Sequence, residues 1–363
     1  MKRIHCYTSS LAGGGAEKQL TNLSSFLAEK GYDVTLVTLK VIKDKYPAPK
    51  NVKRVILGYD VNKSFFFKLY KKIYVFFYFL TLKTDCVISY QTSANVEALR
   101  ALRFRRKIKV IVSERNTVAW ELSKVERFAY ERLYLHADYV VPNSYTMGRY
   151  LIELNPQLAP KIKTIINYTE TSLYKVTPLP LGETLQIGVF ARFQKQKNYE
   201  RFAQMLGKIK KTDHRHFKVR WYGPMTDYSY YKHFSELIIN YNIQDLIELH
   251  DFVSDIPHAM EALDMICLPS IYEGFSNSLA EAICCGKPVI TGDVSDNSVM
   301  VVNGKNGFLF NPNDVDDMFN VFSSAIQSSN KVLNDMSEYS RMQAEKLFSK
   351  EVFVDSYINL IEN

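Results

Sequence analysis

The sequence predicts an α/β protein made of two doubly wound domains, each with a parallel sheet. In both halves, short apolar runs alternate with segments whose apolar residues recur every three or four positions, the patterns of strands and helices. With 363 residues, the chain can form two cores of ordinary size. The polar, proline-containing stretch 169–184 lies between the halves, and we interpret it as the linker.

The first half begins with a βαβ unit. A strand at 4–7 precedes the glycine loop 11–17, LAGGGAE, and a helix that ends near Gly31. Because the loop matches neither G-x-G-x-x-G nor a P-loop, it can be a tight turn or a phosphate cradle. The further strands predicted in this half are 34–39, 85–89, 109–113 and 137–141.

The second half starts with a strand at 185–190, followed by a basic loop with Arg192 and Lys197 and then a helix. Cations between a strand end and a helix start are well placed for a diphosphate, although a solvated loop is the simpler interpretation. The further strands predicted are 217–222, 246–250, 265–268 and 288–291, and 336–361 is expected to be helical.

Two glutamates stand in the stretch after strand 265–268. Glu273 lies in a polar loop, and Glu281 lies in a short helix that Ser278 opens and Gly286 ends. Amides at such a helix start can hold an anion, and carboxylates suit sugar hydroxyls. Two simpler interpretations stay open: Ser278 and Glu281 match a capping box, and Glu273 can be an ordinary loop carboxylate. Eight helical residues span about 12 Å, more than the roughly 5–10 Å between paired glycosidase carboxylates.

Composition argues against several kinds of site. The five cysteines are odd in number and lack C-x-x-C spacing, so we expect no disulfide or zinc framework and a reducing cytoplasm. No signal-peptide pattern opens the chain. Asp314, Asp316 and Asp317 open a helix, where acids favour the dipole, so we expect no metal site.

Charge is uneven along the chain. Residues 1–168 hold 28 Lys and Arg against 13 Asp and Glu, whereas the remainder holds 18 against 25. The basic half is therefore expected to meet something anionic. We expect no nucleic acid there, because the aromatic residues are not spaced as stacking platforms and no such motif is present.

The segment 64–83 mixes aromatic residues with lysines, among them Lys68, Lys71 and Lys72. Its apolar run of about ten residues is too short for a bilayer that needs roughly 20. It suits a helix lying among lipid headgroups, and a core helix with a basic edge is the alternative. The basic cluster 100–109 supports an anionic membrane surface as partner.

The central stretch resembles the signature of the family 4 glycosyltransferases of the GT-B fold, in these segments: Tyr272-Glu273-Gly274-Phe275, Glu281-Ala282, Cys285-Gly286-Lys287-Pro288-Val289-Ile290 and Asn303-Gly304-Lys305-Asn306-Gly307. The resemblance implies two Rossmann-like domains with parallel sheets facing a central cleft. It places an acceptor-binding domain at 1–168, a nucleotide-sugar-binding domain at 169–340, and a final helix at 341–363 that crosses back to the first domain. Residues 165–168 resemble the last strand of the family's first domain.

The resemblance also implies roles for residues. Arg192 and Lys197 would hold the donor diphosphate and act with Glu273 in catalysis, and Glu281 would bind ribose hydroxyls. The segment 251–253 with Ile256 would lie beside the nucleobase. The other implied donor contacts are Gly14, Gly15, Gly274, Phe275, Ser276 and Asn277. No metal or cofactor is implied besides the nucleotide-sugar co-substrate.

One string, Ser113-Glu114-Arg115-Asn116, is similar to a bacterial subset of the family that builds surface or lipid-linked glycans. A polar loop after a strand would face the cleft, so Glu114, Arg115 and Asn116 are candidates for contact with the acceptor or the donor sugar. A local salt bridge is the alternative.

We therefore expect a retaining glycosyltransferase that carries a sugar from a nucleoside-diphosphate sugar, with UDP preferred, to a lipid-linked or polysaccharide glycan acceptor. It would be cytoplasmic and peripheral at the inner face of the membrane. Two alternatives remain: a non-catalytic sugar-nucleotide-binding partner of a glycan assembly complex, and a UDP-N-acetylglucosamine epimerase or hydrolase of the same fold.

Overall fold

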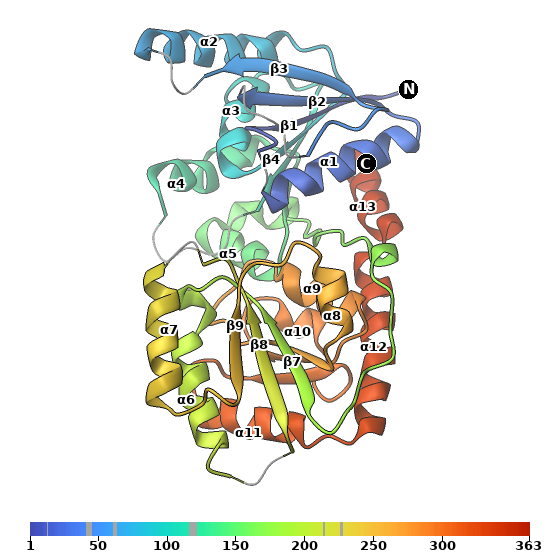
Figure 1. Ribbon diagram of the computed structural model, residues 1–363. Helices are drawn as coiled ribbons and strands as arrows, with labels where there is room; N and C mark the ends of the chain where they lie inside the picture. Colours follow the sequence, from blue (N-terminus) through green and yellow to red (C-terminus); the bar gives the residue numbers. More distant parts are fainter. Residues whose placement is uncertain (13, 41–45, 61–63, 116–121, 213–214, 226–227) are drawn as a thin grey trace. The chain divides into compact units, whose positions relative to one another are not determined.

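The computed structural model describes residues 1–12, 14–40, 46–60, 64–115, 122–212, 215–225 and 228–363 (Figure 1). The predicted contact Asn116 and the side chain of Lys68 lie outside this description. The chain forms two compact units, residues 1–168 with 350–363, and residues 169–349. The second unit thus includes nine residues that we had assigned to the final segment 341–363, and the domain limits given above stay a prediction.

The first unit is built on a six-stranded parallel sheet in the order β3-β2-β1-β4-β5-β6. Its strands are β1 (Arg3–Thr8), β2 (Asp33–Lys40), β3 (Lys53–Tyr59), β4 (Cys86–Tyr90), β5 (Lys109–Glu114) and β6 (Tyr139–Pro142). Its helices are α1 (Gly15–Glu29), α2 (Phe65–Thr81), α3 (Thr92–Leu102), α4 (Lys124–Glu131), η1 (Leu133–His136), α5 (Tyr145–Leu154), η2 (Pro156–Lys161) and α13 (Lys350–Glu362).

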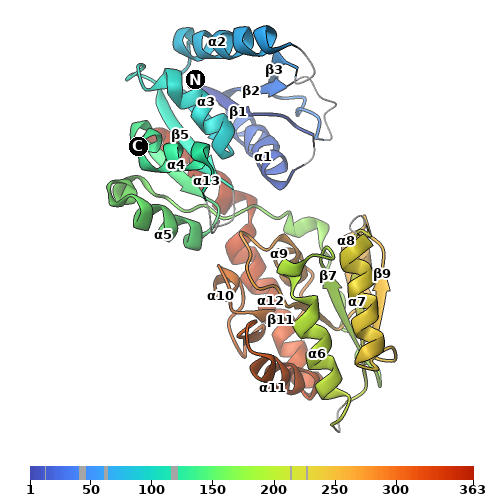
Figure 2. The ribbon, with the colours of Figure 1, turned by 90° about the vertical axis from the view of Figure 1, so that its left-hand side faces the viewer.

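Helices cover both faces of this sheet (Figure 2), because successive side chains of a strand point to opposite faces. Val87 packs with α2, α3 and α4 in one core. Its neighbours Cys86 and Ile88 pack with α1 and α13 in the other. Both faces are therefore apolar, as expected for parallel strands.

The second unit repeats the arrangement, with a parallel sheet in the order β12-β11-β10-β7-β8-β9. Its strands are β7 (Leu185–Phe190), β8 (Phe217–Tyr222), β9 (Ile247–His250), β10 (Met265–Leu268), β11 (Val289–Gly292) and β12 (Gly307–Phe310). Its helices are η3 (Thr171–Leu173), η4 (Lys195–Lys197), α6 (Tyr199–Ile209), α7 (Tyr228–Asn240), α8 (Ile256–Glu261), α9 (Asn277–Cys284), α10 (Asn297–Met300), α11 (Val315–Ile326) and α12 (Asn330–Phe348).

In each sheet the first strand of the unit pairs with the fourth, β1 with β4 and β7 with β10. The strand order reverses between these neighbours, and such a point is where α/β sheets hold ligands, beyond the carboxyl ends of the strands.

One predicted strand is wrong. The segment 165–168 joins no ladder, although Ile165 still donates its backbone N–H to the carbonyl of Pro142, at 3.1 Å. It runs beside β6 as an extended chain and leads into the second unit. The other strands predicted from apolar runs are confirmed within two residues at each end.

Candidate active site

The loop that follows β7 is fixed by its neighbour strand. Trp221 on β8 donates its indole Nε1–H to the carbonyl of Ala191, at 2.9 Å. A Cβ on Gly223 would lie 2.2 Å from the same oxygen, so only glycine allows this approach. The backbone just before Arg192 is therefore held in one place.

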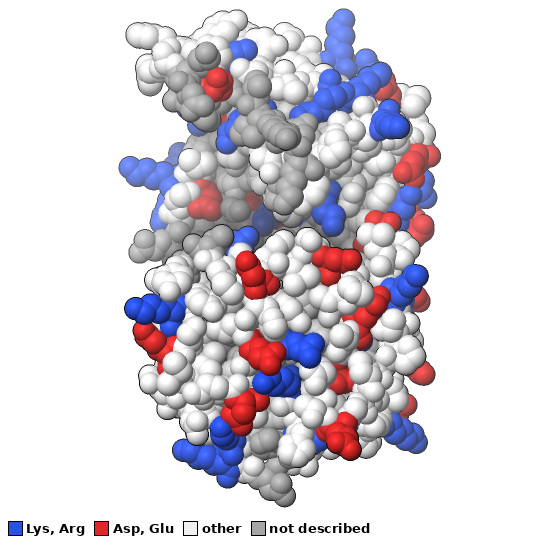
Figure 3. All heavy atoms as spheres, viewed as in Figure 1, with Lys and Arg blue, Asp and Glu red and all other residues white. Residues whose placement is uncertain are grey.

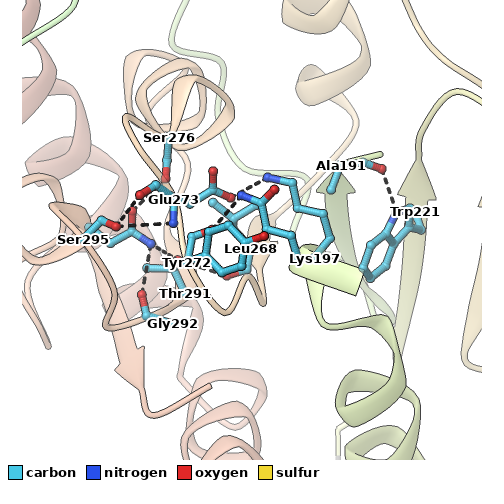
Figure 4. A network of polar contacts seen from close by, with 12 residues as sticks. Ala191, Lys197, Trp221, Leu268, Tyr272, Glu273, Ser276, Thr291, Gly292 and Ser295 are labelled. Carbon is cyan, nitrogen blue, oxygen red and sulfur yellow. Dashed lines mark hydrogen bonds and ion pairs between the residues drawn. The ribbon is translucent and has the colours of Figure 1, made fainter. Parts of the chain in front are cut away.

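At the point where the strand order reverses, Lys197 and Glu273 form an ion pair (Figure 4). Lys197 ends the short helix η4 after β7, and Glu273 lies in the loop after β10. Their side chains are 15% and 9% exposed, so the pair is largely shielded from water. Gln196 joins the two loops, because its Nε2 donates to the Tyr272 carbonyl, at 2.8 Å.

A second set of side chains supports the Glu273 loop through hydrogen bonds. The Ser295 hydroxyl donates to the Glu273 carbonyl and accepts the Glu273 N–H, at 3.3 Å. Ser276 donates to Asn297 Oδ1, at 2.8 Å, and Asn297 Nδ2 in turn donates to the Thr291 hydroxyl, at 2.9 Å (Figure 4). These supports come from around β11, and the sequence patterns did not reveal them.

Helix α9 begins one residue earlier than predicted, at Asn277, with Ser276 as its N-cap. The capping box of Ser278 and Glu281 is therefore wrong, because Ser278 lies inside the first turn. Ser276 makes no side-chain cap bond, since its hydroxyl is directed to Asn297. Gly286 is confirmed as the glycine after the helix, with a φ of 68°.

Glu281 has a partner in the polar stretch before β7. Tyr174 is hydrogen-bonded to Glu281, and burial together with this carboxylate raises the pKa of the Tyr174 hydroxyl. Arg341 on α12 donates to the carbonyl of Tyr174, at 2.7 Å, which holds this part of the backbone on the second unit. Glu281 is therefore positioned by a residue of the predicted linker.

A hollow lies at the ends of β7 and β8. Phe190 and Tyr222 form part of its wall, and their rings stack with centroids 4.9 Å apart. The exposed Arg192 lines the same hollow. The lining also includes Phe252, Val253 and Ile256, from the segment that the family resemblance places beside a nucleobase. Ser278 on α9 lines it as well.

The glycine loop of the first unit is hydrogen-bonded to a nearby glutamate, Glu17. Gly14 caps α1 and Gly15 is its first residue. Glu17 accepts the Gly14 N–H and the Ser10 hydroxyl, both at 2.7 Å, and is 6% exposed. A carboxylate of the protein thus lies at this helix start, and donor contact of Gly14 and Gly15 stays a prediction.

Glu114 and Arg115 have local partners in the first unit. Glu114 is 0% exposed and accepts hydrogen bonds from the hydroxyls of Thr92, at 2.9 Å, and Tyr134, at 2.8 Å. The predicted alternative of a local salt bridge stays a prediction. The role of both residues toward a sugar stays a prediction, which the burial of Glu114 does not favour.

Arg115 joins β5 to the last helix. It donates to the Tyr357 hydroxyl on α13, at 2.8 Å, and to Asn167 Oδ1, at 2.7 Å. Its guanidinium lies over the Tyr90 ring, 4.2 Å from the centroid. These contacts anchor α13 within the first unit.

Two general features complete the description. Among the described residues, no group of three or more His, Cys, Asp or Glu side chains is arranged to hold a metal ion. Across the same residues, no helix combines the length and apolar character needed to cross a membrane.

Comparison with known proteins covers both units. The family model "Glycosyl transferases group 1" matches residues 177–343, and "Glycosyltransferase Family 4" matches residues 13–172. The HepE protein of Anabaena, solved with UDP and glucose, has the same fold with a TM-score of 0.80, at 18% identity over all of both chains.

Two curated relatives are enzymes of lipid-linked glycans. The chain is 30% identical over 126 residues to UDP-Gal:alpha-D-GlcNAc-diphosphoundecaprenol alpha-1,3-galactosyltransferase of Escherichia coli. That match spans about a third of each chain, 32%. The chain is also 25% identical over 313 residues, 81% of each chain, to N-acetylgalactosamine-N,N'-diacetylbacillosaminyl-diphospho-undecaprenol 4-alpha-N-acetylgalactosaminyltransferase of Campylobacter jejuni. From the two matched models and the paired parallel sheets, the chain belongs to the family 4 glycosyltransferases of the GT-B fold.

Proposed function

We propose that the protein transfers a sugar, with retention of configuration, from a nucleoside-diphosphate sugar to a lipid-linked glycan acceptor. The observation that carries this proposal is the shielded ion pair of Lys197 and Glu273 where the strand order of the second sheet reverses. It joins a cation for phosphate and an acceptor for sugar hydroxyls at one sheet edge.

The leaving group in such a transfer is a nucleoside diphosphate, whose charge grows as its bond to the sugar breaks. Arg192 and Lys197, together with the start of α9, would stabilise that charge. Glu273 would accept hydrogen bonds from the sugar, and Glu281 from the ribose. The acceptor oxygen would attack from the face that the diphosphate leaves, and its proton would pass to the departing phosphate oxygen. No metal is required in this scheme.

UDP is the nucleotide we favour. The relative from Escherichia coli is named for UDP-galactose, and HepE was solved with UDP. In this chain, the stacked rings of Phe190 and Tyr222 beside the exposed Arg192 offer an apolar wall with a cation at its edge, which suits a base joined to phosphates.

The acceptor we favour is carried on a lipid, because both relatives are named for diphosphoundecaprenol acceptors. Helix α2 supports work at a cytoplasmic membrane surface. It is not a well-buried core helix, since Phe66 is 80% exposed and Phe77 53%. Figure 3 shows the surface over α2 as largely white. Lys71 donates to the Leu57 carbonyl, at 3.2 Å, so Lys72 is the better placed of these two lysines for headgroups.

Calorimetric titration of UDP, GDP and ADP tests the donor site. We expect one nucleotide to bind, and Glu281→Ala to weaken it tenfold or more, about 1.4 kcal/mol. Turnover of the sugar nucleotide should require the acceptor. Turnover without acceptor would instead indicate an epimerase or hydrolase, and binding without turnover a non-catalytic partner.

Flotation with anionic liposomes tests the membrane surface. Ile73→Asp with Phe77→Asp should leave the protein at the bottom of the gradient. Val332→Asp with Met342→Asp, at exposed positions of α12, should float like the wild type. Equal flotation of all three proteins would exclude α2 as the contact surface.

A further inference from the structure

A second apolar groove lies in the first unit, between α2, α3 and α4. Val75 and Phe76 on α2 form one wall, and Val96 on α3 forms the other. Leu39, at the end of β2, and Val125 on α4 close its ends. Its volume is about 230 Å³, which holds a short length of chain rather than a whole substrate.

Two cations stand at the opening of this groove. Lys72 and Arg100 line it and are both exposed, one on α2 and one on α3. Such a pair can hold a phosphate group from two sides while the apolar walls take what is attached to it.

One carboxyl also lines the groove. Glu97 accepts the Tyr7 hydroxyl, at 2.6 Å, and burial raises the pKa of this carboxyl. Tyr7 thus holds this carboxyl on the side of the sheet, whereas the charges of Lys40, Lys72 and Arg100 act against the effect of burial on its pKa.

The outer surface of α2 continues the apolar character of the groove. Phe66, Tyr70, Ile73 and Phe77 follow one another at helical spacing and are 80%, 60%, 50% and 53% exposed. A soluble helix ordinarily presents polar residues on that side. The helix that supplies Lys72 and Phe76 to the groove thus also presents an apolar stripe, which fits the end of a hydrocarbon chain coming from a lipid layer.

We propose that the groove between α2 and α3 binds the phosphate-bearing end of a lipid-linked diphosphate, with the first carbons of its hydrocarbon chain between Phe76 and Val96 and its phosphates at Lys72 and Arg100. The inference rests on the proposed function for the nature of the ligand, an acceptor carried on lipid.

The placement also agrees with the sheet. Ser93, at the first turn of α3, lines the groove and lies 3.2 Å from Ser9, which follows β1. The groove therefore reaches the carboxyl ends of β1 and β4, where the strand order of the first sheet reverses. A sugar attached to the diphosphate would lie at that edge, as an acceptor of this unit should.

Calorimetry with farnesyl diphosphate tests the groove without turnover, in the presence of saturating UDP so that the second unit does not take up the probe. Inorganic diphosphate is the anion-only probe, and farnesol is the chain-only probe. We expect farnesyl diphosphate to bind at least tenfold more tightly than either.

Variants locate the site. Arg100→Gln and Lys72→Gln should each weaken farnesyl diphosphate binding about three- to tenfold. Val96→Trp fills the groove, and Val125→Asp places a negative charge at its half-exposed end, so both should weaken it more than tenfold. Arg103→Gln is the matched control, since Arg103 lies over the Phe104 ring, 4.7 Å away, and should bind like the wild type.

If inorganic diphosphate binds as tightly as farnesyl diphosphate, the groove is a site for free anions and the inference is wrong. If farnesol binds as tightly, the groove is an unspecific apolar site and the inference is wrong as well. Wild-type affinity in Val125→Asp would overturn the inference even if Val96→Trp fails to fold. UDP binding to each variant reports an intact second unit. If the wild type does not bind UDP but gives the expected farnesyl diphosphate results, the donor proposal is contradicted and the groove proposal is not.

Discussion

The two sheets have the same strand order, yet their reversal points carry different chemistry. In the first unit the loop after β1 closes on Glu17 through Gly14 and Ser10, and neutral serines meet beside β4. In the second unit, Lys197 and Glu273 meet as a shielded ion pair.

The same strand order thus creates an equivalent position at the edge of each sheet, and the side chains there differ in the kind of ligand they suit. An edge whose Gly14 N–H and Ser10 hydroxyl are satisfied by the buried Glu17 carboxylate can lie against a neutral glycan. A cation and a carboxylate that are held by surrounding loops make an edge suited to a phosphorylated sugar. The following experiments would break or sharpen that contrast.

The largest effect is expected from Lys197→Met. It removes the cation from the second edge and leaves the nearly buried Glu273 carboxylate without its partner. Sugar transfer should fall about 10²- to 10³-fold, as when one group that stabilises developing charge is lost. Lys195→Met, an exposed change in the same short helix, should keep transfer near wild type. Similar rates for both variants would remove the functional contrast between the edges.

Glu114→Gln tests whether the first unit uses its carboxylate for structure. Glu114 is fully buried among hydroxyl donors, so the change should lower the free energy of unfolding by about 2 kcal/mol. Glu273→Gln should lower transfer with a smaller effect on stability. Urea unfolding and initial rates measure the two quantities. Unchanged stability with impaired transfer in Glu114→Gln would assign Glu114 to a substrate.

Tyr357→Phe tests the anchor of α13. It removes an acceptor that binds the Tyr90 hydroxyl, at 2.7 Å, and Arg115, at 2.8 Å. We expect the free energy of unfolding to fall by about 1–2 kcal/mol, because the buried Tyr90 hydroxyl and the half-buried Arg115 guanidinium each lose an acceptor. Tyr228→Phe, at a tyrosine 69% exposed, serves as the neutral control. If the two variants have the same melting temperature, Arg115 is available for a role outside this network.

The smallest effect is expected from Gly286→Ala, which tests how firmly α9 is placed. Gly286 has a φ of +68°, and a Cβ there would lie 3.0 Å from Val176 Cγ1. The cost should be about 1 kcal/mol. Gly182→Ala has no positive φ and open space around it, so it should leave the melting temperature unchanged. A neutral Gly286→Ala would mean that this end of α9 adapts.

Local patterns predicted most of the sheets because parallel strands buried on both faces are short apolar runs. Met265–Leu268 was predicted to the residue, and it is β10. The segment 165–168, a strand by resemblance to the family, is not one here, because Ile165 forms a backbone bond to Pro142 without a ladder. Apolar character alone does not show whether a partner strand is present.

The site was predicted in part. Lys197 and Glu273 were selected from their motifs, and the structure brings them together. Arg115 shows the limit, because its partner Tyr357 lies 242 positions away in the sequence, and no local pattern contains such a contact. The supports Ser295 and Asn297 were missed for a related reason, since small polar residues there resemble any surface loop.

The discontinuity of the first unit has a consequence for biosynthesis. Phe353 and Tyr357 on α13 belong to the buried core that α1 and β4 share, yet the ribosome makes them after all of 169–349. The amino-terminal unit would leave the exit tunnel with the part of this core that α13 covers still exposed, while the unit made later can close first. Domains usually complete in the order of synthesis, whereas here the first unit cannot be complete before the second has been made, and the exposed part is where a chaperone would bind a nascent chain.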